Sequence, residues 1–122
     1  MTTKIIGGVA VIESREAIIK DAASAIDLMM TVKYETGCDK IALNKEAFVP
    51  EFFILSTQIA GEILEKFITY RTRLAIYGDF SRYTSKPLKD FIYESNRGKD
   101  IFFVESQEQA LRRLGAEQSA RK

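Results

Sequence analysis

Leu74-Ala75-Ile76-Tyr77-Gly78-Asp79 is a short apolar run that ends in a turn signal, and the fold class follows from it. Two more apolar runs stand on either side of it in the chain, at 40–43 and 101–104. Short apolar runs without alternation are typical of strands that are buried on both faces, as parallel strands are. The three runs therefore predict neighbouring strands in a mainly parallel sheet, joined by crossover connections.

Helical patterns separate these predicted strands. Apolar residues recur there at helical spacing, with charged residues mostly between them. Glycine and capping residues mark where the helices begin and end. The helices are predicted at roughly 19–34, at 50–71 as one kinked helix or two, from Thr84 or Ser85 to about 97, and after a capping box formed by Ser106 and Gln109.

A hairpin is predicted at the beginning of the chain, over residues 3–13. Gly7 and Gly8 lie between two β-branched runs, and glycine accepts the positive φ that tight hairpin turns need. The predicted order is β-β-α-β-α-β-α-β-α, an α/β fold with a mixed sheet. We expect one domain over 1–115 and a frayed polar tail over 116–122.

The composition limits the possible chemistry. The chain of 122 residues has no histidine and one cysteine, Cys38, which excludes histidine-based triads, histidine-ligated metals and a thiolate zinc cage within one chain. We therefore expect no metal site and no cofactor. An enzyme is not favoured, although a mechanism that uses only carboxylates stays open.

Charge and hydropathy bear on partners and location. The 18 basic and 17 acidic residues are spread evenly along the chain, so nucleic acid is not an expected partner. No apolar stretch is long enough to span a membrane. A lone cysteine favours a reducing compartment, and the expected location is cytoplasmic.

Three segments resemble the motifs of a bacterial family of domains of unknown function, domain of unknown function 4180. They are 57–67, 74–81 and 89–98, which read TQIAGEILEKF, LAIYGDFS and KDFIYESNRG. The resemblance extends from Ile5 to Leu114 and is most specific over 57–104.

A more distant resemblance concerns the fold. A strand that ends in Gly78-Asp79, a helix, and then a strand leading into Ser106-x-x-x-Ala110-Leu111 is similar to STAS-like domains, the sulfate-transporter and anti-sigma-antagonist domains. This resemblance implies a small regulatory or ligand-binding module. The anti-sigma-antagonist motif carries a phosphorylated serine in an Asp-Ser-Ser-Gly context, whereas the equivalent stretch at 55–58 is Leu-Ser-Thr-Gln.

The segment after the central strand is the first candidate site. It leads from a strand into a helix, where ligands usually bind in α/β sheets, and its cations could hold a phosphate or carboxylate. The alternative is that Thr84 and Ser85 only cap the helix, that the cations are solvated, and that Asp79 bonds turn amides. The candidate ligand-binding residues are Asp79, Ser81, Arg82, Tyr83, Thr84, Ser85 and Lys86.

Two hydroxyl residues, Ser56 and Thr57, could line the same edge as donors or phosphoacceptors. The alternative is that they cap a helix at a kink. Next to them lies the apolar run 52–55, which one helix face cannot bury completely. We expect Phe52, Phe53 and Leu55 either to contact a partner or to form a buried corner under the hairpin.

Two functions follow from these observations. The first is a non-enzymatic regulatory or protein-interaction module, expected to be a homodimer. The alternative is a protein that binds a small anionic or amphiphilic ligand at the 79–86 loop.

Overall fold

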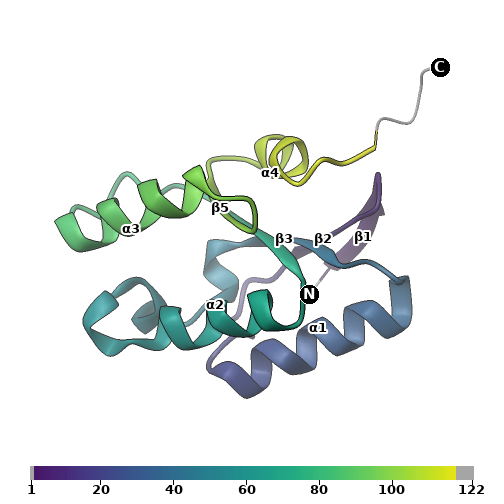
Figure 1. Ribbon diagram of the computed structural model, residues 1–122, viewed down its shortest axis with the longest axis horizontal. Helices are drawn as coiled ribbons and strands as arrows, with labels where there is room; N and C mark the ends of the chain where they lie inside the picture. Colours follow the sequence, from purple (N-terminus) through teal and green to yellow (C-terminus); the bar gives the residue numbers. More distant parts are fainter. Residues whose placement is uncertain (1, 118–122) are drawn as a thin grey trace.

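Five strands in the spatial order β1-β2-β3-β4-β5 form the sheet of the computed structural model, which describes residues 2–117 (Figure 1). Strand β1 pairs with β2 in an antiparallel hairpin, and β2, β3, β4 and β5 are parallel. The mainly parallel mixed sheet predicted from the sequence is therefore confirmed. The strands are Thr2–Ile6, Val9–Glu13, Lys40–Asn44, Arg73–Tyr77 and Ile101–Val104.

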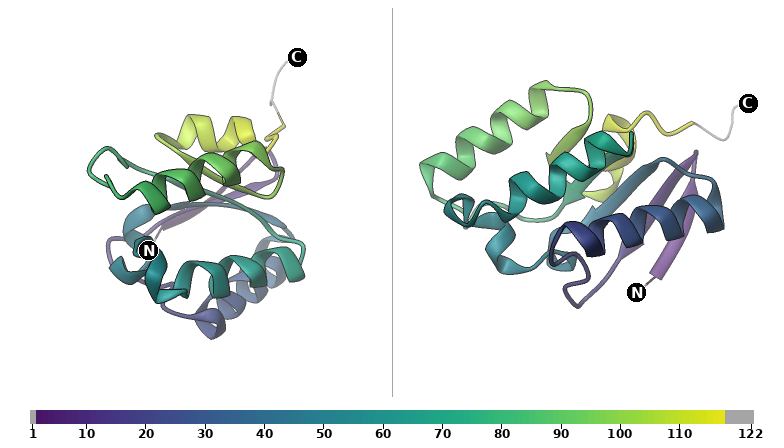
Figure 2. Two further views of the ribbon diagram at one scale, coloured as in Figure 1. Left: turned by 60° about the vertical axis from the view of Figure 1, so that its left-hand side comes forward. Right: turned by 60° about the horizontal axis from the view of Figure 1, so that its bottom comes forward.

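Four helices cover the two faces of the sheet unequally (Figure 2). Three helices, α1, α2 and α3, pack against the face that carries Ile41, Leu74 and Phe103. Among the described helices, only α4 packs on the other face, against Ala42 and Phe102. The helices are Ala22–Thr36, Ile59–Thr69, Lys86–Arg97 and Gln107–Arg113.

The hairpin turn has the predicted chemistry. Gly7 and Gly8 have φ values of 56° and 86°, which places both in the conformation that favours glycine. The backbone N–H of Glu117 donates to the Gly7 carbonyl at 2.8 Å, and Ala116 is half-buried. The chain is therefore held at 116–117, where a frayed tail was predicted. Residues 118–122 of that predicted tail lie outside the described residues.

Helix α1 begins three residues later than predicted. The backbone of Ile19 forms a parallel bridge with Phe48, so Ile19 is used in a strand-like contact. The Asp21 side chain then accepts a hydrogen bond from the Ser24 N–H at 2.8 Å and caps the helix. Because the bridge joins residues far apart in the chain, helical spacing alone could not show it.

The segment 50–71 is a helix only in its second half. Two short 3₁₀ turns, Pro50–Phe53 and Leu55–Thr57, precede α2, and Gln58 between them and the helix has a φ of 66°. The predicted capping box before α4 is half formed. Ser106 accepts from the Gln109 N–H, but the Gln109 side chain accepts from the Glu105 N–H instead of the Ser106 N–H.

The outer edge of β5 is closed by side chains. The Asn96 amide accepts from the Phe103 N–H at 2.7 Å and donates to the Phe103 carbonyl at 3.0 Å. The Glu105 N–H is bonded to the Gln109 side chain at 2.8 Å. These contacts satisfy backbone groups that would otherwise be free to pair with another strand.

Candidate functional site

The carboxyl ends of the parallel strands form the edge where ligands usually bind in α/β sheets. Strand β4 is followed there by Gly78 and the 79–86 loop, and β3 is followed by Lys45. After β4 the chain goes to the face covered by α3, whereas after β5 it goes to the face covered by α4. This edge therefore includes a switch point of the kind where binding crevices open.

Asp79 opens the loop with a local turn. Its carboxylate accepts a hydrogen bond from the Ser81 N–H at 2.9 Å. Hydrogen bonding from the Ser81 hydroxyl and backbone amide lowers the pKa of Asp79, and the charges of Lys45 and Arg82 lower it further. This is the turn-bonding role that the sequence allowed for Asp79.

Lys45 is a site residue that sequence reasoning missed. Its ammonium donates to the Asp79 carbonyl and lies 4.9 Å from the centre of the Tyr83 ring. The Tyr83 ring is stacked on Phe53 at 5.0 Å with an interplanar angle of 12°. A cation directly after a buried strand was the only local signal, and these contacts join Lys45 to residues more than thirty positions away.

The two cations of the loop differ in their surroundings. Lys86 forms an ion pair with Asp90 at 2.8 Å, one helical turn further along α3. Arg82 is exposed, and within residues 2–117 no carboxylate lies within 4.0 Å of it. Ser85 caps α3 by accepting from the Leu88 N–H at 3.3 Å, and Thr84 is exposed. Arg82 is thus the cation of this loop that is available to an anion.

Of Ser56 and Thr57, only Thr57 contacts the beginning of α2. Gln58 occupies the N-cap position without a capping side-chain bond, but the Thr57 hydroxyl accepts from the Ile59 N–H at 3.3 Å. The Thr57 hydroxyl lies 2.7 Å from the Ile54 carbonyl and stabilises the preceding 3₁₀ turn. Both side chains are exposed. Thr57 therefore bonds both sides of the break before α2, though not from the N-cap position, and a role of the two residues as ligand donors stays a prediction.

The apolar run 52–55 is divided between the core and the surface. Phe52 and Phe53 are buried, Leu55 is half-buried, and Ile54 is exposed. The expected burial is found for the two phenylalanines, whose rings lie 4.9 Å apart. A partner contact at this run stays a prediction, and Ile54 and Leu55 are the side chains that could reach the partner.

Two buried polar side chains tie the strand ends together. The Asn44 amide accepts from the Ser14 N–H at 2.8 Å and donates to the Ser14 carbonyl at 2.7 Å. The Tyr77 hydroxyl lies 3.2 Å from the Ile12 carbonyl and accepts from the Gln107 side chain at 3.1 Å. Burial raises the pKa of Tyr77. Because their polar atoms have partners within the chain, these residues stabilise the edge.

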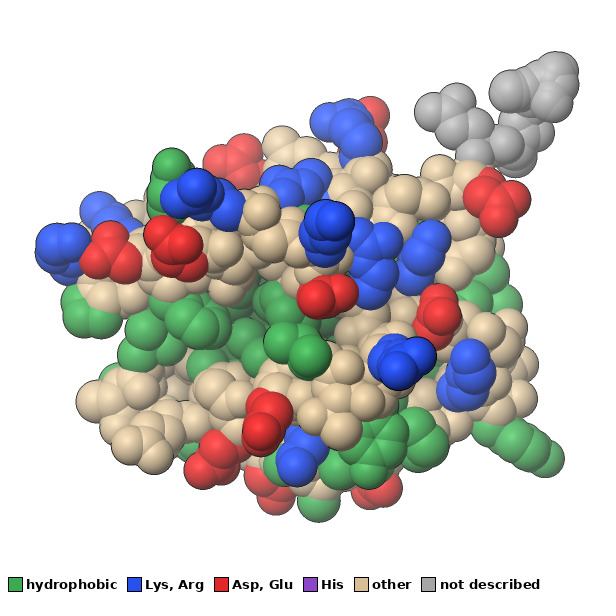
Figure 3. Space-filling model, viewed as in Figure 1, with side chains coloured by type: hydrophobic (Ala, Val, Ile, Leu, Met, Phe, Trp, Pro, Cys, Tyr) green, Lys and Arg blue, Asp and Glu red, His purple; other side chains and the backbone are tan. Residues whose placement is uncertain are grey.

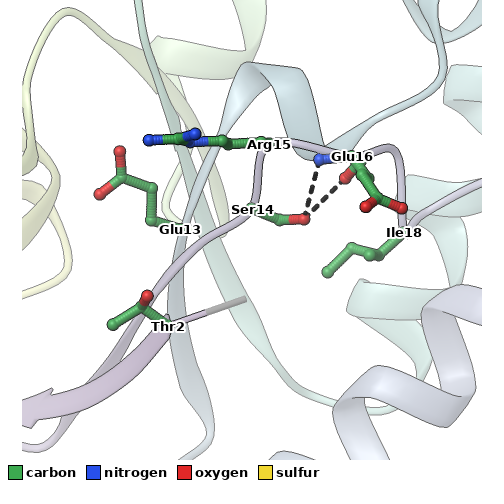
Figure 4. A pocket seen from close by; sticks show the side chains of 6 residues that line it. All are labelled: Thr2, Glu13, Ser14, Arg15, Glu16 and Ile18. Atoms are coloured by element: carbon green, nitrogen blue, oxygen red, sulfur yellow. Dashed lines mark hydrogen bonds between the residues drawn. The ribbon is translucent and has the colours of Figure 1, made fainter.

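A polar pocket of about 650 Å³ lies beside Ser14, the residue that Asn44 binds, and sequence reasoning missed it (Figure 4). The only feature of the sequence that could have indicated this pocket is the run of polar and charged residues at the end of β2 and directly after it. The Ser14 hydroxyl is turned toward the backbone of Glu16, to which it donates at 2.7 Å. The pocket is lined by Thr2, Glu13, Ser14, Arg15, Glu16 and Ile18.

In residues 2–117, no three histidine, cysteine, aspartate or glutamate side chains gather into a potential metal site. No described helix is long and apolar enough to cross a membrane.

Comparison with known proteins identifies a family. Residues 7–114 match the family model described as domain of unknown function, DUF4180. No curated protein and no solved structure matches the chain.

Proposed function

We propose that this chain, which belongs to the DUF4180 family, is a non-enzymatic regulatory module of STAS-like architecture that acts through protein–protein contacts. The order β-β-α-β-α-β-α-β-α, with an antiparallel first strand, supports the STAS-like part of the proposal. A second copy of the chain is one of the partners that we expect, which would make the protein a homodimer.

An exposed apolar surface at the ends of α1 and α2 carries this proposal. Met30 and Tyr34 are 45% and 91% exposed, and Tyr70 is 43% exposed. Met30 and Tyr34 are one turn apart on α1 and therefore share a face. Met30 and Tyr70 line the same hollow of about 340 Å³. We call Met30, Tyr34 and Tyr70 the α1–α2 apolar surface.

The energetics favour a partner at this surface. Complete burial of a large apolar side chain stabilises a complex by about 1.5–3 kcal/mol. Tyrosine and methionine are also enriched in protein interfaces, and tyrosine is frequent among the residues that dominate binding energy. Two tyrosines and a methionine beside a hollow therefore fit a docking site better than a solvated surface.

The test compares a surface variant with a matched control. Met30→Ser/Tyr70→Ser alters the α1–α2 apolar surface, whereas Tyr93→Ser changes an exposed tyrosine on α3. Ile54→Ser tests the predicted contact at 52–55 separately. Sedimentation velocity over a range of concentrations reports the dimer, and affinity capture with mass spectrometry reports other partners.

We expect the wild-type chain and Tyr93→Ser to dimerise or to capture the same protein repeatedly, and the double variant to lose that contact. A wild-type chain that stays monomeric at high concentration and captures no protein would contradict the proposal.

The 79–86 loop supports a second candidate, the binding of a small anionic ligand. Its specific observation is the exposed Arg82 guanidinium: besides hydrogen bonding within the loop, the Lys45 ammonium and this guanidinium together lower the pKa of the Asp79 carboxylate. Thermal-shift measurements with phosphates, nucleotides, carboxylates and fatty acids test it. Unchanged melting across these ligands would count against it, as would a ligand that Arg82→Ala/Lys86→Ala still binds equally well.

A further inference from the structure

Several basic side chains lie at the amino ends of the parallel strands, although the chain as a whole has nearly equal numbers of basic and acidic residues. Figure 3 shows Lys and Arg side chains gathering between α4 and the ends of α1 and α2, with fewer acidic side chains among them. Two acidic residues, Asp39 and Asp100, lie at the same strand starts. We call five residues the amino-edge cluster: Lys40, Arg71, Arg73, Lys99 and Arg113.

Two members of the cluster occupy directly opposite positions in the sheet. Lys40 and Arg73 are the first residues of β3 and β4, and they are paired in register on the same face of the sheet. Like charges directly opposite each other destabilise a sheet. An anion placed against this pair would offset that cost.

Two guanidiniums of the cluster are oriented without any carboxylate. Arg73 donates from Nε to the Lys99 carbonyl at 2.7 Å, and Arg113 donates to the Asn96 carbonyl. Their guanidinium carbons lie 5.9 Å and 4.3 Å from the centre of the same Phe102 ring. In the described structure no member of the cluster has a carboxylate within 4.0 Å. These oriented, unneutralised cations are suited to carboxylates.

Helix capping explains only part of the cluster. Arg113 lies in the last turn of α4, where a cation is stabilised by the negative helix end. Lys40 and Arg73, in contrast, lie within strands.

Arg71 is in the left-handed conformation, at a φ of 55° directly after α2. Glycine is favoured at this position of a helix end, and a residue with a Cβ atom is less stable there.

The cluster adjoins the α1–α2 apolar surface. The hollow that Met30 and Tyr70 line is also lined by two cations, Lys33 and Arg71, and by one carboxylate, Asp39. A nucleic acid would need a continuous basic track and would leave the apolar part of this hollow unfilled. An acidic protein segment with one apolar side chain would use both features, because its carboxylates would meet the cations while the apolar side chain fills the hollow.

We propose that the amino edge of the sheet, from the α1–α2 apolar surface to Lys40, Arg73 and Arg113, binds an acidic segment of a partner protein that inserts an apolar anchor into the hollow. This inference rests on the proposed protein-interaction function and names its surface and the chemistry of its partner.

Fluorescence anisotropy on the full chain at low salt tests the inference with three probes. The first is a short glutamate-rich peptide with a central Leu-Phe pair, the second has serines in place of that pair, and the third is oligothymidylate of equal charge. Lys40→Gln/Arg73→Gln alters the cluster. Lys20→Gln/Lys89→Gln removes two exposed cations near the beginnings of α1 and α3, away from the cluster, as a matched control. Urea unfolding confirms that each variant is folded.

The anchored peptide is expected to bind about tenfold more tightly than the serine peptide, and about tenfold more weakly to the cluster variant than to the control. Rising salt should weaken binding. Three results would each overturn the inference: no binding of the anchored peptide, equal affinity for the cluster and control variants, or tighter binding of oligothymidylate.

The proposed function is judged separately by sedimentation and capture. If Met30→Ser/Tyr70→Ser loses its partner while the peptide does not bind, only the acidic-partner inference fails. If the wild-type chain also has no partner, both fail.

Discussion

Replacing Arg71 by glycine should stabilise the fold and weaken its binding to an acidic partner. Arg71 follows α2 with a φ of 55°, and the next N–H, that of Thr72, donates back to the Phe67 carbonyl at 2.8 Å. This pattern ends many helices, and glycine is preferred at the left-handed position. The chain has arginine there, so the position combines a backbone strain with an exposed cation.

The magnitude follows from two opposing terms. The left-handed conformation costs a residue with a Cβ atom about 1–2 kcal/mol. Substitution by glycine removes this cost. It also makes the unfolded chain more flexible, which offsets about 0.5–1 kcal/mol of the stabilisation. The free energy of unfolding should therefore rise by about 0.5–1 kcal/mol, which raises the Tm by about 2–4 °C. Loss of one cation at the edge of a binding surface should weaken peptide binding about twofold.

Gln58→Gly is the matched control, because Gln58 is the other described non-glycine residue with a positive φ, at 66°. Its side chain is exposed at the beginning of α2, whereas Arg71 follows the end of that helix. Urea unfolding measures stability, and anisotropy with the anchored peptide measures binding. Both glycine variants should be stabilised, but only Arg71→Gly should bind more weakly. A destabilised Arg71→Gly variant would refute the strain argument, and unchanged affinity would refute its role in binding.

Three further predictions concern other parts of the chain. Asn96→Ala leaves one backbone N–H and one C=O unpaired on the outer edge of β5, so we expect a loss of about 2–3 kcal/mol in urea unfolding and more aggregation by light scattering. The pKa of Asp79 is lowered from 3.8, so the ionised side chain stabilises the fold above pH 3.8, and this contribution is lost as the pH falls through the lowered pKa. Asp79→Asn should therefore flatten the decline of the free energy of unfolding in acid. An unchanged pH profile would contradict this. A Cβ atom on Gly7 would lie 2.3 Å from the Glu117 carbonyl oxygen, whereas one on Gly8 would meet nothing within 4 Å. Hydrogen exchange at the Glu117 amide should accelerate in Gly7→Ala and stay slow in Gly8→Ala, and equal exchange would show that the contact is not formed.

The strands and the number of α-helices were predictable because their signals are local. Each apolar run of the parallel sheet lies within one residue of the strand that it predicted. The errors arise where distant segments meet. Ile19 follows the helical spacing of α1, but its backbone pairs with Phe48, and no periodicity within 19–34 contains that information. The 3₁₀ turns before α2 likewise depend on distant contacts, since Phe53 is buried under Tyr83 of the 79–86 loop.

The candidate site shows the same division. The Asp79 turn and the Ser85 cap involve residues two and three positions apart, and both were within reach of sequence reasoning. Lys45 contacts Asp79 and Tyr83 only because β3 and β4 are neighbours in the sheet. Its importance follows from the strand order, which short-range patterns do not determine.

In a parallel sheet, counting charged residues along the chain does not show where those charges gather in space. Every parallel strand begins at the same edge, so a single basic residue at the start of each strand is enough to build a cluster. Lys40 and Arg73 are 33 positions apart in the chain and directly opposite each other in the sheet. The helices between the strands run back toward the same edge, which adds cations at their ends. A chain with a net charge of +1 can thus present a basic edge to an acidic partner, although no segment of its sequence has a large excess of basic residues.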